Sequence, residues 1–459
     1  MKKCSRQALG LALGALAWGL PFAGLGYAAD LSLPEAIELA LAQNTELRVT
    51  QKGEESADAA LRQAKGNNGM SVSASDRVSF SKTESTEHST GNVLSLNGSL
   101  PLYSGGKNQA NIRSAELGVD TALLTTERGR ENLKLQVVKA YYDALQARKT
   151  IDVDQESVDN YQAHLTNVQQ LYSAGSKARI DVLRTSVQLS DARQTLIKAQ
   201  NAYEVDLATL RNLLNIDRNE PLNLTTDFSY EEFDTAMDEA IAYAHLHRKD
   251  LLVDAYKVEQ KEQSVKAAKA GYLPSIDLSM GTSQSNDFHP SSDSALSFSA
   301  GVGVSWQVFD SGVTRAQVDS AETELDFAKL TLQKDRETTD LELRQAYYNM
   351  REAEKRFKST SDAVQQAEED YYIAREKYRA GEGLMLDIID AQLALSTARL
   401  NYISAQYDYA RYKAEVENKM GLGLTETERT ASYRLLETMP AAVDAAGELA
   451  EETKRNGVK

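Results

Sequence analysis

Alternation of apolar and polar side chains is the strongest local pattern in the chain. Over residues 296–308 one face is apolar throughout, and the other face is small or polar. The apolar positions are Leu296, Phe298, Ala300, Val302, Val304, Trp306 and Val308. This two-residue period is typical of a membrane β-strand with one face toward lipid and the other toward a wet lumen. A weaker version occupies residues 94–102. A strand of a soluble β-sandwich is the alternative interpretation.

A second alternating segment precedes each of these two strands, Ser71–Phe80 in the first half of the chain and Ser275–Thr282 in the second. The polar stretches between them, Ser81–Asn92 and Gln284–Ser294, predict exposed hairpin loops. Four strands cannot close a membrane barrel, because the smallest outer-membrane barrels have about eight. We therefore expect several copies of the chain to share one barrel, and three copies would supply twelve strands.

Very long helices are predicted after the strands, over residues 106–172 and 312–378. Each spans 67 residues, and a rise of 1.5 Å per residue makes each about 100 Å long. Apolar residues in both recur at alternating intervals of three and four, which is the pattern of a coiled-coil seam. The seam positions are Val158, Tyr161, Leu165, Val168 and Tyr172 in the first helix and Val364, Ala367, Tyr371, Ala374 and Tyr378 in the second.

The same order of elements occurs twice, which indicates an internal duplication. Each copy has a first helix (about 32–66 and about 235–270), two strands, the long helix, a Gly turn and a return helix. The chain matches itself at an offset of 206 residues, and at 204 upstream of the strands. For example, Ala140-Tyr141-Tyr142 falls on Ala346-Tyr347-Tyr348. The second copy therefore has two additional residues in between, which we expect in a loop.

The repeats set the domain boundaries. Residues 1–28 contain a basic start, an apolar run and a small-residue cleavage signal, so we expect a secretory signal peptide. A membrane anchor is the alternative, but the apolar run is shorter than the about 20 residues that a spanning helix needs. The further predicted units are a first repeat (29–215), a linker (216–234), a second repeat (235–424) and a charged C-terminal tail (425–459).

Composition excludes several classes of function. The formal net charge of −16 argues against a nucleic-acid-binding surface. Cys4 is the only cysteine and lies in the predicted signal peptide, so we expect neither disulfides nor an acyl anchor in the mature chain. The histidines are scattered, and no phosphate-binding Gly loop follows a strand. The sequence therefore predicts no enzyme, no cofactor and no metal site.

The duplicated order of elements resembles the TolC family of outer-membrane efflux and type I secretion ducts, over nearly the whole mature chain. The resemblance implies a mostly α-helical homotrimer with membrane β-structure. Twelve strands would form one barrel in outer-membrane lipid, continuous with a coiled-coil α-helical barrel across the periplasm. It also implies passive export, with an inner-membrane ABC or RND transporter and a periplasmic adaptor (membrane fusion) protein as partners. The matching motifs are Leu33-Pro34-Glu35-Ala36, Leu102-Tyr103-Ser104-Gly105-Gly106, Gly271-Tyr272-Leu273-Pro274-Ser275 and Val308-Phe309-Asp310-Ser311-Gly312.

Candidate chemistry lies at the turns between the long and return helices. Asp387 and Asp390 are three residues apart and therefore share one helical face. Three-fold symmetry would gather six such carboxylates, and a ring of this kind favours cations. An ordinary solvated helix face is the alternative. The resemblance implies that this pair lines the channel constriction and that Gly175, Gly381 and Gly383 belong to the hairpin turns.

The two turns differ in charge, because Arg184 occupies the position in the first copy that Asp390 occupies in the second. The resemblance implies that links between the hairpins close the gate and that Tyr378 and Asp181 belong to those links. The arginine of the family link falls on Gly383 here, so the contacts must differ.

A substitute for the missing link is an ion pair. We hypothesise that Arg184 or Lys177 pairs with Asp390 or Asp387. The alternative to the whole channel interpretation is a secreted coiled-coil tether or adhesin without channel activity. The sequence leaves a drug-like molecule, a metal and a polypeptide open as cargo. Absence of a lipidated amino-terminal cysteine favours the secretion-type branch of the family.

Arginine substitutions test the lipid-facing strand. Replacing Val302 or Val304 by Arg should destabilise the protein by about 2–4 kcal/mol each near the bilayer midplane, but far less on a surface sheet. We expect both variants to be lost from the membrane-inserted, detergent-extracted fraction. Ser299→Arg, on the opposite face of the strand, is the control and should insert. Normal insertion of both valine variants would refute a lipid-facing strand.

Overall fold

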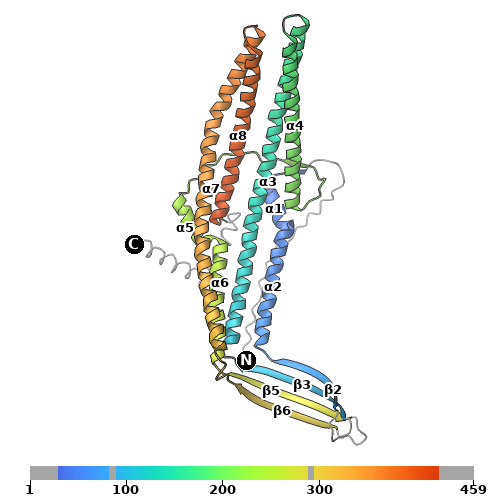
Figure 1. Ribbon diagram of the computed structural model, residues 1–459, viewed down its shortest axis with the longest axis vertical. Coiled ribbons are helices and arrows are strands. Elements are labelled where there is room, and N and C mark those ends of the chain that lie inside the picture. The colour runs from blue at the N-terminus through green and yellow to red at the C-terminus, as the bar shows by residue number, and fades with distance from the viewer. Residues whose placement is uncertain (1–28, 82–88, 288–293, 423–459) are drawn as a thin grey trace, which may run out of the picture.

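The computed structural model describes residues 29–81, 89–287 and 294–422. The predicted signal peptide (1–28), the charged tail (425–459) and the middle of each predicted hairpin loop lie outside these residues. The described chain is a long bundle of helices with a four-stranded sheet at one end (Figure 1). Among the described residues, no helix is both long and apolar enough to cross a membrane.

The sheet is antiparallel and has the strand order β2-β3-β5-β6. Its strands are β2 (Ser71–Ser81), β3 (Ser89–Tyr103), β5 (Ser275–Asp287) and β6 (Ala295–Ser305). The hairpin of the second half therefore continues the hairpin of the first half in one sheet. Within it, β2 and β6 form the two edges.

The alternation of apolar and polar residues along the strands gives this sheet two chemically different faces. One face is apolar and exposed in the single chain: Val72, Leu94, Leu96, Met280, Leu296, Phe298, Val302 and Val304. The other face carries hydroxyl groups that hydrogen bond across the strands in the pairs Ser71–Ser99, Ser75–Ser95 and Ser283–Ser297, at 2.7–2.9 Å. Such cross-strand pairs fix the strand register that separates the two faces.

The strands reach further toward the hairpin ends than the sequence predicted. Residues 89–92 belong to β3 and residues 284–287 to β5, so their assignment to loops was wrong. The polar side chains there bond to one another across the sheet. Asn92 Nδ2 donates to Asp76 Oδ1 at 2.8 Å, and Asn286 Nδ2 donates to Asn92 Oδ1 at 3.3 Å. Polar composition indicated a loop because such cross-strand partners cannot be read from one segment alone.

At the other end of the sheet, β6 is shorter than the alternation suggested. Trp306 and Val308 lie beyond its last residue, Ser305, so their placement on the strand was wrong. Trp306 Nε1 instead donates to the carbonyl oxygen of Tyr272 at 3.1 Å. This bond holds the exit from the strand against the entrance to β5. The chain then turns through Gly312 (φ 88°) into the next helix.

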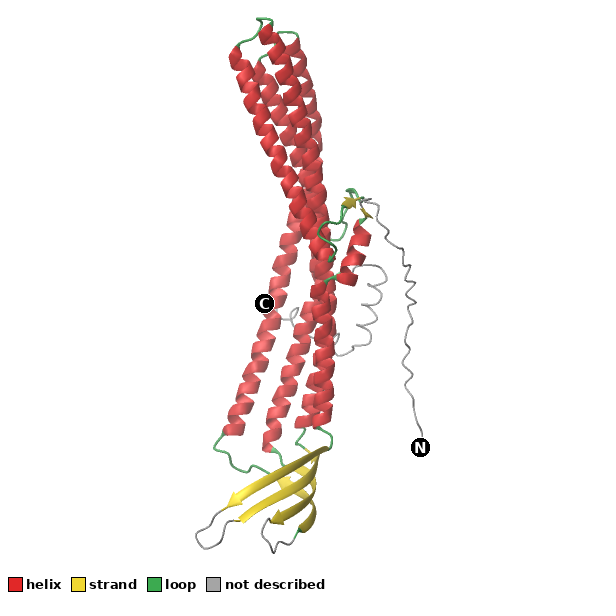
Figure 2. Cartoon of the chain, turned by 90° about the vertical axis from the view of Figure 1, so that its right-hand side faces the viewer, coloured by secondary structure: helices red, strands yellow, loops and turns green. Residues whose placement is uncertain are grey.

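Two long helices run from the sheet to the far end of the molecule (Figure 1). They are α3 (Lys107–Ser173) and α7 (Val313–Arg379), each of 67 residues, displaced by one residue from the prediction. The return helices are α4 (Arg179–Leu214) and α8 (Met385–Met420), each of 36 residues. Figure 2 shows the turns of the hairpins α3–α4 and α7–α8 at the end opposite the sheet. The hairpins contact each other through α3 and α8, and Val168 of α3 shares an apolar cluster with Ala374 of α7 and Ile388 of α8.

The first helix of each half is broken in two, which corrects the predicted single helices. The first half has α1 (Leu33–Gln43) and α2 (Thr45–Asn67), and the second has α5 (Met237–His247) and α6 (Lys249–Lys269). One residue with extended backbone, Asn44 or Arg248, separates each pair. The side-chain oxygen of Asn44 accepts bonds from the first amides of α2, as an N-cap does.

Because of these breaks, α2 begins at the end of the return helix α4, and α6 begins at the end of the return helix α8. Asn44 Nδ2 donates to the carbonyl oxygen of Leu213 at 3.0 Å, where α4 ends and α2 begins. At the end of α8, a Cβ on Gly421 would lie 3.0 Å from the Cα of Arg248, so the backbones of α8 and α6 are in close contact. Each return helix is thereby extended toward the sheet alongside α3 or α7. We call these two joints the waist.

Packing at the waist also uses residues that no helix pattern predicted. Strands β1 (Ala29–Leu31) and β4 (Leu222–Leu224) pair in parallel. Tyr141 is fully buried beside them, donates its hydroxyl proton to the carbonyl oxygen of Leu31 at 2.8 Å and accepts from the amide of Thr226 at 3.0 Å. The segment predicted as a linker therefore packs against α3.

The second joint of the waist is ionic. Arg248 is 7% exposed and contacts Asp250 at 2.6 Å and Glu342 at 3.3 Å, while Lys419 contacts Glu342 at 3.0 Å. Burial raises the pKa of Asp250, but the hydrogen bond from Arg248 and the charge of Arg128 outweigh it and lower that pKa. The ion pairs tie together helices α6, α7 and α8.

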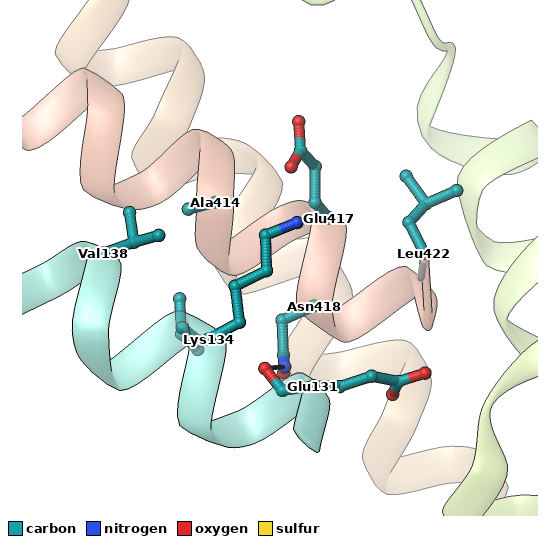
Figure 3. Close-up of a pocket in the computed structure, with 8 residues that line it drawn as sticks. Glu131, Lys134, Val138, Ala414, Glu417, Asn418 and Leu422 are labelled. Carbon is teal, nitrogen blue, oxygen red and sulfur yellow. Dashed lines mark hydrogen bonds between the residues drawn. The ribbon is translucent and has the colours of Figure 1, made fainter. Parts of the chain in front are cut away.

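A small cavity of about 10 Å³ lies between α3 and α8 beside this joint (Figure 3). Glu131, Val138, Asn418 and Leu422 are among its lining residues. Asn418 Nδ2 donates to the carbonyl oxygen of Glu131 at 3.0 Å across its edge. This volume is enough for about one water molecule, so the cavity is too small for a ligand.

Removal of Arg248 tests the ionic joint. Arg248→Ala would leave Asp250 and Glu342 without their buried partner, so we expect a loss of about 1–3 kcal/mol in the free energy of unfolding. Lys52→Ala removes an exposed pair with Glu55 and should change stability by less than about 0.5 kcal/mol. Denaturant unfolding of the detergent-solubilised protein measures both. Equal stability of the two variants would contradict a structural role for the joint.

Candidate channel constriction at the hairpin tips

The two hairpin turns begin with the same backbone conformation. Gly175 follows α3 with φ 77°, and Gly381 follows α7 with φ 82°, a left-handed conformation that favours glycine. The amide of Gly175 donates to the carbonyl oxygen of Tyr172 at 3.0 Å, and that of Gly381 to Tyr378 at 3.1 Å. Both glycines therefore end a helix and start the turn.

Gly383 is required for a different reason. A Cβ at this position would lie 2.8 Å from the backbone nitrogen of Tyr378 and 3.1 Å from the carbonyl carbon of Lys377. Real Cβ atoms do not approach backbone so closely, hence no side chain fits without movement of the turn. The turn geometry thus excludes an arginine at the position where the family resemblance places one.

Asp181 and Asp387 occupy equivalent places at the start of the return helices. Asp181 Oδ2 accepts from the amide of Ala178 at 3.4 Å, and Asp387 Oδ2 accepts from the amide of Leu384 at 3.1 Å. A carboxylate in the first helical turn is also favoured by the helix dipole. Asp387 therefore has a structural role in the hairpin. Asp390 lies one turn further along α8, and both carboxylates are exposed in the single chain.

The two cations of the first hairpin tip, Lys177 and Arg184, have different surroundings. Lys177 Nζ is 4.4 Å from the ring centroid of Tyr378, and Arg184 is exposed on α4. Neither cation forms an ion pair with Asp387 or Asp390 within the described part of one chain. Pairing between copies stays a prediction.

Tyr378 is the centre of the contact between the two tips. It is 2% exposed, and within the described residues its hydroxyl has no hydrogen-bond partner. Burial, and to a lesser degree the charge of Asp181, raises the pKa of Tyr378. Asp181 is thus close enough to act on Tyr378 without a direct bond. His164 of α3 packs edge-on against its ring at 5.3 Å.

An apolar cluster surrounds this contact and joins both hairpins. It contains Val168 from the first hairpin and Ala374, Tyr378, Ile388 and Ala391 from the second. Sequence reasoning placed Val168, Ala374 and Tyr378 on the seams but missed His164, because the histidines looked scattered. Its position three residues after the seam residue Tyr161 was the available signal.

Helices that run from a sheet with one apolar face to paired turns with acidic and basic side chains define a protein of the outer-membrane channel class. The chain belongs to the outer membrane efflux protein family, whose sequence profile matches residues 36–215 and 240–422. Members of this family are transport proteins of the outer membrane rather than enzymes.

Individual relatives include both efflux and secretion proteins. The chain is 22% identical over 379 residues to "Outer membrane efflux protein BepC" of Brucella suis biovar 1, covering 82% of each chain. It is 27% identical over 309 residues to "Alkaline protease secretion protein AprF" of Pseudomonas aeruginosa, covering 64% of this chain and 62% of the relative. The CmeC outer membrane channel of Campylobacter jejuni has the same fold, with a TM-score of 0.77, 20% identity and 94% coverage of both chains.

Substitution of Gly383 tests the turn geometry. Gly383→Ala forces a Cβ against the backbone of Tyr378, so we expect a loss of about 1–3 kcal/mol and faster proteolytic cleavage at the tip. Gly129→Ala is the control, because its Cβ would meet only ordinary contacts at 3.7 Å or more. In the middle of α3 that change should stabilise the helix by up to about 1 kcal/mol. Unchanged proteolysis of the Gly383 variant would contradict the close contact.

Proposed function

We propose that three copies of this chain form an exit duct for passive export across the periplasm and the outer membrane. The match of the efflux family profile to both halves of the chain carries the proposal. It also favours the duct over a secreted tether or adhesin. An inner-membrane ABC or RND transporter would supply the energy, and a periplasmic adaptor would join it to the duct.

The open edges of the sheet support an assembly of several copies. Strands β2 and β6 each pair on one side only within the described sheet. Unpaired backbone groups cannot face lipid, so a membrane sheet must close on itself. If β6 of one copy pairs with β2 of the next, three copies give a closed barrel of twelve strands with its hydroxyl face inward.

The helices next to these edges carry exposed apolar side chains on one side of the molecule and an open hollow on the other. On α7, Phe327 and Leu330 are 73% and 65% exposed. On α2, an open hollow of about 150 Å³ is lined by Ala60, Gln63, Ala64 and Asn67 together with Asn108 and Asn111 of α3. Copies joined through β6 and β2 would bring these two surfaces together.

Ion pairs show that the two surfaces lie at the same height above the sheet. Lys65 of α2 contacts Glu116 of α3 at 3.6 Å, and Lys269 of α6 contacts Glu322 of α7 at 2.8 Å. Glu116 and Glu322 are equivalent in the two halves. Ala60, five residues from Lys65, is therefore level with Phe327, five residues from Glu322. We propose that Phe327 of one copy fills the hollow on the next.

The duplication and the division of the chain are part of the same proposal. A first repeat (29–215) and a second repeat (235–424) would form equivalent walls, with the linker (216–234) at the waist. Equal lengths of α3 and α7 and of α4 and α8 support this division. A cleaved signal peptide (1–28) and a charged tail (425–459) complete it.

The inner end of the duct would be the hairpin tips. They lie opposite the sheet (Figure 1), and Asp387 and Asp390 are exposed there. Three copies would gather six carboxylates around one axis, which attracts cations. Relatives named for toluene efflux and for alkaline protease secretion leave both small molecules and polypeptides as cargo classes.

Neutralising the carboxylates tests the constriction. We expect the double variant Asp387→Asn, Asp390→Asn to lose most of its preference for cations in planar bilayers, and to lose block by divalent cations, because the ring charge is gone. Asp362→Asn, at an exposed position of α7 away from the tip, is the control and should retain both properties. Unchanged cation preference in the double variant would contradict the carboxylate constriction.

A further inference from the structure

We propose that His164 is a pH-sensitive catch between the two hairpins of each subunit, which holds them together while its imidazole is neutral and releases them when it is protonated. The proposal assigns a regulation to the hairpin tips. It rests on the proposed function, because separation of the hairpins matters for export only if they line a duct.

One tyrosine ring connects the parts of the catch. The imidazole of His164, on α3, packs edge-on against Tyr378 of α7, with 5.3 Å between ring centroids and 64° between ring planes. Lys177, in the turn after α3, places its Nζ 4.4 Å from the centroid of the same ring. Two groups of the first hairpin therefore hold one side chain of the second hairpin.

Within the described part of the chain, the contact lies nearer the tip than the polar links that join the hairpins. Further from the tip, Ser157 bonds to Ser396 at 2.7 Å, and Asn160 Nδ2 donates to Gln392 Oε1 at 3.1 Å. One turn after Asn160, at His164, the contact between hairpins becomes aromatic and apolar. The tips are thus held by packing that a single buried charge can disturb.

The buried edge of the His164 imidazole has no hydrogen-bond partner. Its Nε2 is buried, and within the described residues that atom has no hydrogen-bond partner. The ring of Tyr378 packs against the imidazole. Its hydroxyl group also has no hydrogen-bond partner among the described residues. A protonated imidazole would need an acceptor at Nε2, and an ion buried without one is strongly disfavoured. Separation of the hairpins would let water supply that acceptor.

The charges around His164 also oppose its protonation. Burial, and after it the charge of Lys177, lowers the pKa of His164. From α4, Asp181 acts on Tyr378 rather than on the imidazole. From α8, Asp390 acts on Tyr161, one turn before His164. No carboxylate offsets the effect of Lys177 on His164 among the causes of its pKa shift.

The sign of the pH effect follows from this shift. With the hairpins apart, a hydrated His164 would have its ordinary pKa of about 6.5. With the hairpins together that pKa is lower, so the closed arrangement binds fewer protons. Its full stability is present above about pH 6.5 and is lost as pH falls toward the lower value of the closed form. Each unit of depression changes the closed-to-open ratio about tenfold.

Conductance in planar bilayers between pH 7.5 and 5 tests the catch. We expect the open fraction of the wild-type channel to rise on acidification. His164→Phe keeps an aromatic ring against Tyr378 but cannot be protonated, so the rise should disappear, and His164→Gln should also abolish it. Lys177→Gln should reduce the rise. His245→Gln, at a histidine bonded to Asp340, is the matched control and should keep it.

Four results would overturn the catch. One is an acid-induced rise that persists in both His164 variants, and another is a wild-type channel that does not respond to pH. In either case the proposed duct stands, because the wild type still conducts. Absence of conductance by the wild type at every pH would overturn the duct and the catch together. The Asp387→Asn, Asp390→Asn variant should keep the pH response, and its loss there would assign the response to the carboxylates instead.

Discussion

Backbone hydrogen bonding at the edges of the sheet is the constraint on which the rest of the molecule depends. One chain supplies four strands whose edges, β2 and β6, are open. In a membrane both edges must find partners, and the apolar face next to them must face lipid. In the proposed assembly, closure by further copies would fix where the helices lie, since α2 and α7 adjoin the two edges. The long helices then determine where the hairpin tips lie, about 100 Å from the sheet.

The two halves of the chain use the same lengths and order of elements but differ in chemistry at both ends of the return helices. At the waist, the joint of the first half is made by the neutral amide of Asn44, whereas the second joint is made by the buried Arg248 with Asp250 and Glu342. At the tips, Arg184 in the first half occupies the position that Asp390 occupies in the second half. Equivalent walls can therefore carry hairpins with different electrostatic roles.

Periodicity in the sequence was sufficient for the strand faces, the long helices and the glycine turns, because these depend on residues close in the chain. The breaks at Asn44 and Arg248 were missed. Neither site has a Pro or Gly, and each break is stabilised by the end of another helix more than 150 residues away. The contact of His164 with Tyr378 joins residues from different halves, so the spacing from Tyr161 could place His164 near the seam but could not identify its partner. The exclusion of a side chain at Gly383 likewise became visible only from the distances in the turn.

The central claim is that three copies share one barrel through the edges β6 and β2. Native mass spectrometry of the detergent-extracted protein counts the copies directly. The account predicts a single assembly of three chains that becomes monomeric when the edges are blocked, for example by prolines in β6. A stable monomer, or an assembly with any other number of chains, would contradict it.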